Sequence, residues 1–409
     1  MNEKNAKTCR IQVPGTPLFI DPTSGFPLMK PSRTVLYFVL DWGLGHATRS
    51  IPVIRALLNS HHRVVIVSTG RSLALLRREF GGCEFEDLPD YGIRYSRHRG
   101  FLSLDLLAKT PRILLRLILE HREAEKLAAR FRADVIISDN RYGCYSGSLP
   151  SYLITHQLRF QLSRMLRPFA WVSEWFNRYY FRHYRKVLVP DSAGTPNLSG
   201  DLSHRGRIAD HPKVRYVGPL SSLESGGYAG GEKINILFLI SGPEPQRTKF
   251  EALVMGQAEA LPGVKVVVLG KPEDEAEPRS RNRKGLTVFP HLERKRLSGY
   301  LNRAEWVVSR SGYSTIMDLM AIKRKAVLIP TPGQTEQEYL ADNLQKTKLF
   351  FSVRQKGLDL PRALRDAERF YAHRLPKLRF NRVDAILSLI GSRHSRPGRS
   401  ETGARISGE

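Results

Sequence analysis

Short apolar runs rich in β-branched residues alternate along this chain with helical stretches. This alternation is typical of parallel strands joined by crossover helices. In the first half, the expected strands are Thr34–Leu40, Arg63–Val67, Val135–Ser138, Tyr152–Thr155, Val187–Val189 and Val214–Val217. In the second half, they are Ile234–Ile240, Val264–Leu269, Leu286–Phe289, Trp306–Val308 and Val327–Ile329.

A glycine-rich segment at 221–232 separates the two series of strands and has the composition of a flexible joint. The pattern predicts an α/β protein with two doubly wound, Rossmann-like domains, at 34–220 and 233–360. The loops at the carboxyl ends of their strands would face each other across a cleft. We expect an irregular extension at 1–33 and a disordered basic tail at 393–409.

The chain has 409 residues, a hydrophobic share of 41% and a formal net charge of +26. This charge favours attraction to a polyanion, which could be nucleic acid, an anionic membrane face or a diphosphate substrate. The cysteines Cys9, Cys83 and Cys144 show neither paired spacing nor a zinc pattern, which is typical of the cytoplasm. No apolar run reaches the roughly 18 residues that span a bilayer, and residues 1–33 lack the apolar core of a signal peptide. Any membrane attachment would therefore be peripheral, on the inner face.

The stretch from Trp306 to Asn343 carries the most specific chemistry. An apolar strand ends in a Ser-Gly turn that opens a helix, and a second strand ends in a Pro-Gly loop that enters another helix. A turn of this kind leaves the first amides of the helix unpaired and pointing into the cleft, where they suit a phosphate. Asp318 lies six residues after Gly312, about one turn into the helix, and could accept two hydroxyls of a ribose. The pattern therefore predicts a site for a nucleoside diphosphate.

The segment Arg310–Asp318 resembles the carboxyl-terminal half of the glycosyltransferase family 28 enzymes. It matches their Arg-Ser-Gly-x-x-Thr-x-x-Glu motif with Asp in place of Glu. The best-known member adds N-acetylglucosamine to the lipid-linked peptidoglycan precursor. The resemblance implies the GT-B fold, in which residues 361–392 would return to the first domain. It also implies transfer of a hexose or N-acetylhexosamine from a nucleotide-sugar, most simply a UDP-sugar, to an acceptor that could be a lipid or a glycan.

The resemblance implies a donor site at both loops of the second domain. The loop Ser241–Arg247 departs from the family's Gly-Gly-Ser-x-Gly, because two prolines remove amides. His291 lies where the family holds the uracil ring, although a loop-packing role is an alternative. Glu336 could bind the donor sugar or simply lie in the first turn of a helix capped by Thr335. The expected donor contacts are Ser241, Gly242, His291, Leu292, Arg310, Ser311, Gly312, Ser314, Thr315, Asp318, Gln334, Glu336 and Gln337.

The first strand ends in a Gly-x-Gly turn followed by a histidine and an arginine. A glycosyl transfer that proceeds with inversion needs a base for the acceptor's proton, and by analogy with family 28 His46 is the candidate. It could instead cap the helix. Asp139 could orient His46, bind acceptor hydroxyls or cap the next turn, and Arg49 could bind an acceptor phosphate or form a surface ion pair. The expected acceptor contacts are Gly43, Gly45, Arg49 and His156.

The stretch from Phe160 to Tyr184 interleaves aromatic residues with arginine. It could pack in a core, bind a lipid acceptor or membrane, or stack on RNA, which is the least favoured of the three. No Asp-x-Asp pair follows a strand, so we expect neither a metal nor another cofactor. Two other functions remain open: a nucleotide-sugar 2-epimerase of the same fold, and a non-catalytic basic protein that binds membrane or RNA.

Overall fold

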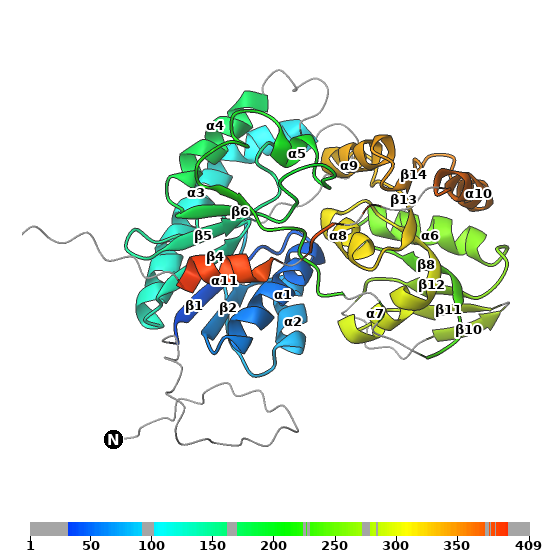
Figure 1. Ribbon diagram of the computed structural model, residues 1–409, viewed down its shortest axis with the longest axis horizontal. Helices are drawn as coiled ribbons and strands as arrows, with labels where there is room; N and C mark the ends of the chain where they lie inside the picture. Colours follow the sequence, from blue (N-terminus) through cyan, green and yellow to red (C-terminus); the bar gives the residue numbers. More distant parts are fainter. Residues whose placement is uncertain are drawn as a thin grey trace, which may run out of the picture.

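The computed structural model describes residues 32–91, 102–161, 170–223, 226, 230–271, 279–283, 285–372, 376, 378–380 and 382–391. Within them the chain forms two seven-stranded sheets, each covered by helices (Figure 1). The prediction of two doubly wound α/β units is confirmed. The core strands of both sheets are apolar on both faces, as expected for parallel sheets buried between helices.

The first sheet has the strand order β3-β2-β1-β4-β5-β6-β7, and all its neighbouring strands are parallel. The strands are β1 Thr34–Val39, β2 Arg63–Ser68, β3 Glu84–Asp87, β4 Val135–Asp139, β5 Ser151–Ile154, β6 Lys186–Val189 and β7 Val214–Tyr216. The helices that accompany it are α1 Leu44–Asn59, α2 Gly70–Glu79, α3 Leu102–Arg130, α4 Ala170–Phe181 and the short α5 Asp201–His204.

The second sheet has the order β10-β11-β9-β8-β12-β13-β14, with β10 antiparallel to β11 at one edge. Its strands are β8 Ile234–Leu239, β9 Lys265–Val268, β10 Arg279–Arg283, β11 Leu286–Phe289, β12 Ala304–Ser309, β13 Lys325–Leu328 and β14 Phe351–Ser352. The helices that follow in this part of the chain are α6 Gln246–Ala258, α7 Arg294–Arg303, α8 Tyr313–Ala321, α9 Thr335–Lys346 and α10 Leu360–Phe370.

The register of each sheet brings the functional loops together. In the first sheet Val39 lies opposite Asp139, and Asp139 lies opposite Ile154, so the loops after β1, β4 and β5 leave at one level. In the second sheet Ser309 of β12 lies between Leu239 and Leu328, which does the same for the loops after β8, β12 and β13. Both sets flank the point where the strand order reverses, which is where open α/β sheets bind ligands.

The last two helices of the described chain pack against different sheets. Helix α11, Val383–Gly391, buries Val383, Ile386 and Ile390 in the core of the first sheet, and the Tyr152 hydroxyl donates to the Leu389 carbonyl at 2.8 Å. Helix α10 instead packs in the core of the second sheet. The predicted return of 361–392 is therefore too long, because in the described residues only α11 lies against the first sheet (Figure 1).

Candidate active site

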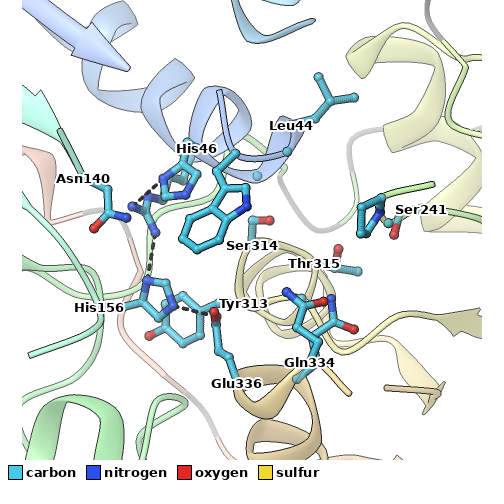
Figure 2. Close-up of a pocket in the computed structure, with 18 of the residues that line it drawn as sticks. Leu44, His46, Asn140, His156, Ser241, Tyr313, Ser314, Thr315, Gln334 and Glu336 are labelled. Atoms are coloured by element: carbon cyan, nitrogen blue, oxygen red, sulfur yellow. Dashed lines mark hydrogen bonds and ion pairs between the residues drawn. The ribbon is translucent and has the colours of Figure 1, made fainter. Parts of the chain in front are cut away.

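A cavity of about 2270 Å³ lies between the carboxyl ends of the two sheets. Figure 2 shows side chains from both halves of the chain pointing into it. The structure brings most of the predicted site residues to its walls: Gly43, Gly45, His46, Arg49, His156, Ser241, Gly242, His291, Leu292, Gly312, Ser314, Thr315, Asp318, Gln334, Glu336 and Gln337. Asp139 lies directly behind this wall, fully buried.

Helix N-termini from both domains converge on this cavity. Helices α1 and α8 start after Gly43 and Gly312, and neither N-cap residue makes a side-chain capping bond. A Cβ added at Gly45 would lie 2.5 Å from the Ser314 hydroxyl, so the two helix starts are packed directly against each other. The first intrahelical bond of α8 runs from the Ile316 amide to the Gly312 carbonyl, which leaves three earlier amides outside the helical ladder. Such a surface favours an anion.

His46 and Asp139 form a buried pair. The His46 Nδ1 atom lies 2.8 Å from Asp139 Oδ1, and the alternative of a helix-capping histidine is wrong, since α1 has no side-chain cap. The Asp139 pKa is lowered to about 2: burial opposes ionisation, but Arg49 and His46 outweigh it. Nδ1 lies between a donor, Arg49 Nη2 at 2.9 Å, and an acceptor, the ionised Asp139 carboxylate, and the contact with Asp139 favours the proton on Nδ1. The unprotonated Nε2 is then the nitrogen available to a substrate.

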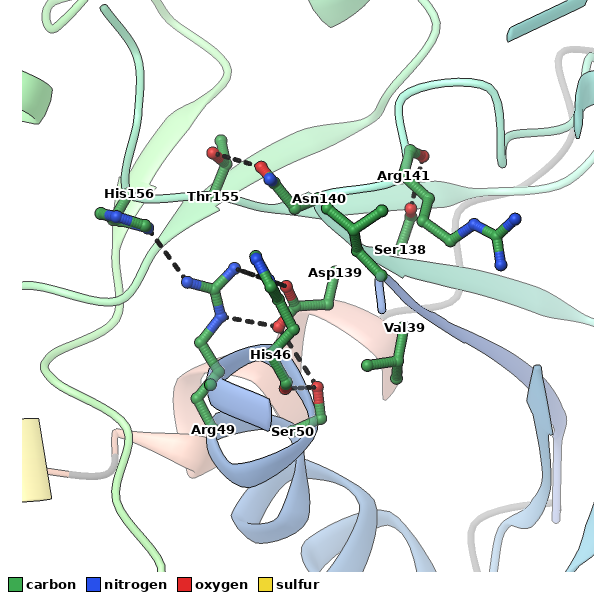
Figure 3. A network of polar contacts seen from close by, with 12 residues as sticks. Val39, His46, Arg49, Ser50, Ser138, Asp139, Asn140, Arg141, Thr155 and His156 are labelled. Carbon is green, nitrogen blue, oxygen red and sulfur yellow. Dashed lines mark hydrogen bonds and ion pairs between the residues drawn. The ribbon is translucent and has the colours of Figure 1, made fainter. Parts of the chain in front are cut away.

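Arg49 fixes this pair from below (Figure 3). Its Nε donates to Asp139 Oδ2 at 2.8 Å, a second guanidinium nitrogen donates to Asp139 Oδ1, and only 3% of its surface is exposed. Of the predicted alternatives, the surface ion pair is wrong, and a phosphate contact would compete with these bonds. Burial first, and then the Arg49 charge, lower the His46 pKa below its usual value, which keeps the imidazole neutral and able to accept a proton.

His156 of the first domain contacts the second domain at the wall of the cavity. His156 Nε2 lies 2.9 Å from Glu336 Oε1, and His156 Nδ1 lies 3.0 Å from Arg49 Nη1. The ring of His156 stacks on Tyr313 of α8, with centroids 4.2 Å apart and planes within 2°. Both ring nitrogens of the predicted acceptor contact are therefore occupied by protein groups.

Arg310 does not reach the cavity, which corrects its prediction as a diphosphate contact. Its guanidinium donates to the carbonyls of Ile329, Pro330 and Gln246 and lies 4.0 Å from the ring centroid of Phe250, with 1% of the residue exposed. Burial lowers its pKa to about 9. It holds β12, β13 and α6 together.

The remaining donor-side residues are tied into the second domain. Asp318 is largely buried, and its Oδ1 accepts from Arg294 and, at 2.6 Å, from the Ser221 hydroxyl. Ser311 is fully buried and donates to the Gln337 carbonyl at 2.8 Å, so its side chain joins the two loops rather than facing the cavity. The N-cap of α9 is Gln334, and Thr335 is not the cap that we expected.

Comparison with known proteins identifies both halves of the chain. Residues 248–374 match the model of the glycosyltransferase family 28 C-terminal domain, and residues 33–150 match the model described as glycosyl transferase family 1. The chain is a glycosyltransferase whose second half resembles family 28. The resemblance inferred from the Arg310–Asp318 motif is confirmed.

Individual relatives of this glycosyltransferase support the assignment. An uncharacterized glycosyltransferase of Methanosarcina acetivorans is 25% identical over 321 residues, which are 74% of this chain and 81% of the relative. The UDP-N-acetylglucosamine--N-acetylmuramyl-(pentapeptide) pyrophosphoryl-undecaprenol N-acetylglucosamine transferase of Caldicellulosiruptor saccharolyticus is 22% identical over 338 residues, 77% of this chain and 83% of the relative. The crystal structure of the glycotransferase of kitacinnamycin has a TM-score of 0.58 at 15% identity, over 88% of this chain and 96% of that one. The predicted GT-B fold is confirmed.

The glycosyltransferase also has an apolar wall, of which the sequence pattern indicated the α4 part but not the α3 part. Helices α3 and α4 border the cavity with Ile113, Leu114, Leu117, Val172 and Phe176. On the outside of the same helices, large apolar side chains are exposed, Trp171 and Trp175 each by 63%. The aromatic stretch therefore divides: Phe181 packs in the core, whereas an exposed apolar face, consisting of Leu114, Leu115, Ile118, Leu119, Trp171, Val172, Trp175 and Tyr179, meets solvent. In the described part of the chain, no helix is long and apolar enough to cross a bilayer.

Arg294 and Tyr313 are two site residues that sequence reasoning missed. Arg294 begins α7 and pairs with Asp318, and the Tyr313 hydroxyl donates to the Pro190 carbonyl of the first domain at 2.9 Å. Tyr313 occupies a variable position of the motif, and Arg294 lies 24 residues before Asp318, so neither had a local signal. Across the described residues, no cluster of three or more His, Cys, Asp or Glu side chains could hold a metal ion.

Proposed function

We propose that this glycosyltransferase moves a hexose or N-acetylhexosamine from a UDP-sugar to a hydroxyl of a lipid-linked acceptor, without a metal ion. The observation that carries the proposal is the His46–Asp139 pair, which lies at a cavity shared with the uncapped start of α8. The His46–Asp139 pair would supply the base, and the start of α8 would bind the leaving diphosphate.

In the proposed reaction, His46 Nε2 takes the acceptor's hydroxyl proton while the acceptor oxygen forms a bond to the anomeric carbon. The bond from that carbon to the diphosphate oxygen breaks, and UDP leaves with the electron pair. Asp139 holds the Nδ1 proton and stabilises the imidazolium that forms. A histidine with an ordinary or lowered pKa is unprotonated at neutral pH, as this step requires.

The donor side of the proposal rests on backbone amides rather than arginine. The amides at the start of α8, with the hydroxyls of Ser314 and Thr315 beside them, would carry the diphosphate. The Asp318 carboxylate would accept the ribose hydroxyls through Oδ2, since Oδ1 is already bonded to Arg294 and Ser221. The side chains of Gln334, Glu336 and Gln337 would contact the sugar.

The acceptor side of the proposal rests on the apolar wall. A lipid chain could run along α3 and α4 from the exposed apolar face to His46, with the protein bound to an anionic membrane surface on the cytoplasmic side. Exposed tryptophans suit a membrane interface, and the net charge of +26 favours anionic lipid.

The test is titration with UDP, GDP, ADP and dTDP, followed by calorimetry and thermal unfolding. We expect UDP to bind most tightly and Asp318→Asn to weaken it about tenfold, the effect of one lost charge-assisted hydrogen bond. Asp342→Asn is the matched control, because this exposed aspartate lines the same cavity but pairs with Arg354 at 3.4 Å. A protein that binds none of the four nucleotides, or whose Asp318→Asn variant binds UDP unchanged, would contradict the proposed donor site.

The acceptor class is tested by turnover. With UDP-N-acetylglucosamine as donor, UDP release should depend on an added polyprenyl-diphosphate-linked sugar in anionic vesicles. Release that is equally fast without any acceptor would contradict a transferase.

A further inference from the structure

A continuous series of polar contacts crosses the cleft from the donor loop to the proposed base. Glu336 stands in the first turn of α9, and its carboxylate contacts His156, which follows β5 of the first domain. His156 contacts Arg49, Arg49 contacts Asp139, and Asp139 contacts His46. Figure 2 shows the contact between His156 and Glu336, and Figure 3 shows His156, Arg49, Asp139 and His46. The residue that joins its two ends is His156.

The chemistry of the two partners fixes the proton on His156. Arginine can only donate, so His156 Nδ1 must accept from Arg49 Nη1 at 3.0 Å. The proton of a neutral imidazole then lies on Nε2, which donates to Glu336 Oε1 at 2.9 Å. Gln157 donates to the other oxygen, Glu336 Oε2. Burial raises the Glu336 pKa, but His156 outweighs it, so the pKa is lowered and the carboxylate stays ionised.

The position of His156 depends on both domains at once. It is 5% exposed, and its ring lies flat on Tyr313, the first residue of α8. The Tyr313 hydroxyl in turn reaches back to the Pro190 carbonyl of the first domain at 2.9 Å. Tyr313 of the second domain therefore fixes the plane of the imidazole. Arg49 of the first domain holds Nδ1, and Glu336 of the second domain holds Nε2. It can make all of these contacts only when the cleft has its present width.

We propose that His156 is a positioning residue that couples the donor loop Gln334–Gln337 to the base pair His46–Asp139, rather than a contact to the acceptor. The inference rests on the proposed function, because it assumes that the loop holds the sugar and that His46 is the base. With Glu336 in place, His156 orients Arg49, and Arg49 holds the Asp139 carboxylate against His46. Loss of the cross-cleft contact would release Arg49 to turn within the site.

Two substitutions cut this series on opposite sides of His156. The amide of His156→Asn reaches only the position of Nδ1, so it can accept from Arg49 but no longer donates to Glu336. The amide of His156→Gln reaches the position of Nε2, so it can donate to Glu336 but no longer accepts from Arg49. We expect kcat to fall about 10- to 100-fold in each, the rate equivalent of one charge-assisted hydrogen bond, with UDP affinity within about twofold of wild type. In a Glu336→Ala background, which already lacks the His156–Glu336 contact, His156→Asn should lower kcat no further.

A second measurement does not depend on turnover. Hydrogen exchange of the amides in 43–50 is measured with UDP-N-acetylglucosamine and with UDP alone. Coupling predicts that the nucleotide-sugar slows exchange in the wild-type protein more than UDP does, and that both His156 variants lose this difference.

The alternatives give different results. A contact to the acceptor would raise the KM for the acceptor with kcat unchanged, and its effect would add to that of Glu336→Ala. A merely structural role would lower the Tm and the UDP affinity together. Either outcome, or protection of 43–50 that survives in both variants, would overturn the coupling. A wild-type protein that binds no nucleotide-sugar would overturn the proposed function and the coupling with it, whereas binding without slower exchange would overturn the coupling alone.

Discussion

Replacement of Asp139 by asparagine tests the proposed base most directly. The asparagine Oδ1 can still accept from Arg49, but its amide nitrogen would face His46 Nδ1 and donate to it. The imidazole proton would then move to Nε2, the atom that must accept the proton of the incoming hydroxyl. We expect kcat to fall about 10²- to 10⁴-fold, which corresponds to roughly 3–5 kcal/mol of transition-state stabilisation.

The same substitution has a predictable effect on stability. Arg49 is 3% exposed, and without the carboxylate its charge would be buried and uncompensated, which costs about 3–5 kcal/mol. The Asp139 pKa of about 2, against 3.8 for an ordinary aspartate, corresponds to about 2.5 kcal/mol of stability at neutral pH. Because this pKa is lowered on folding, the contribution is present above pH 4 and is lost as the pH falls towards 2. Asparagine removes that part of the acid dependence.

The assay is kcat at saturating donor and acceptor, with urea unfolding at pH 7 and pH 3 to show that the variant is folded. Ser50→Ala is the matched control, because the Ser50 hydroxyl donates to Asp139 Oδ2 at 3.2 Å and carries no charge. It should cost about 1 kcal/mol of stability and leave kcat within about threefold. Asp139→Asn should have no further effect on kcat in a His46→Ala background. A folded Asp139→Asn protein with kcat near wild type, or a full effect in that background, would refute the reasoning.

Four further predictions follow from the site. Because the His46 pKa is lowered and the base must be unprotonated, the acid limb of kcat/KM should lie below pH 6.5; a limb above that value would exclude His46. Arg310→Met should reduce the free energy of unfolding in urea by about 2–4 kcal/mol, because three carbonyls lose their donor, with UDP affinity unchanged; weaker UDP binding by the folded variant would restore Arg310 to the donor site. The double variant Trp171→Ser, Trp175→Ser should bind anionic vesicles at least about tenfold more weakly in a flotation assay, and unchanged binding would contradict a membrane role for this face. EDTA should leave turnover within about twofold, and recovery of lost activity by Mg²⁺ or Mn²⁺ would contradict a metal-free reaction.

The sequence predicts the interior of each sheet better than its edges. Eleven strands were expected and found within a residue or two, because buried parallel strands are continuous apolar runs. The three that were missed lie at edges of the sheets: β3 has the sequence Glu-Phe-Glu-Asp, β10 is largely arginine and β14 has two residues. An edge strand has only one partner and needs little apolar surface, so its sequence resembles a loop.

Position along a strand predicts which residues reach the cleft, but not which way each side chain turns. His46 lies in the first turn of α1, just after β1, and Asp139 ends the neighbouring strand β4; the register brings their side chains to 2.8 Å. Arg310 also follows a strand directly, yet its guanidinium turns beneath α6 onto Phe250. That direction depends on packing between elements 60 residues apart, which no local pattern records. The same holds for Arg294, whose partner Asp318 belongs to another helix.

Helix α11 ties the first half of the molecule to a segment that the ribosome adds after all the strands of both sheets. The core of the first sheet includes Val383, Ile386 and Ile390, so β1 to β7 emerge long before that core can close. During synthesis the second half leaves the ribosomal tunnel and folds while the first half still exposes the apolar surface that α11 will cover. An isolated fragment 32–223 should therefore aggregate or bind chaperones, and supplying 378–391 as a fused segment should rescue it. Any dissection of this enzyme into separately expressed halves has to carry that short helix with the first one.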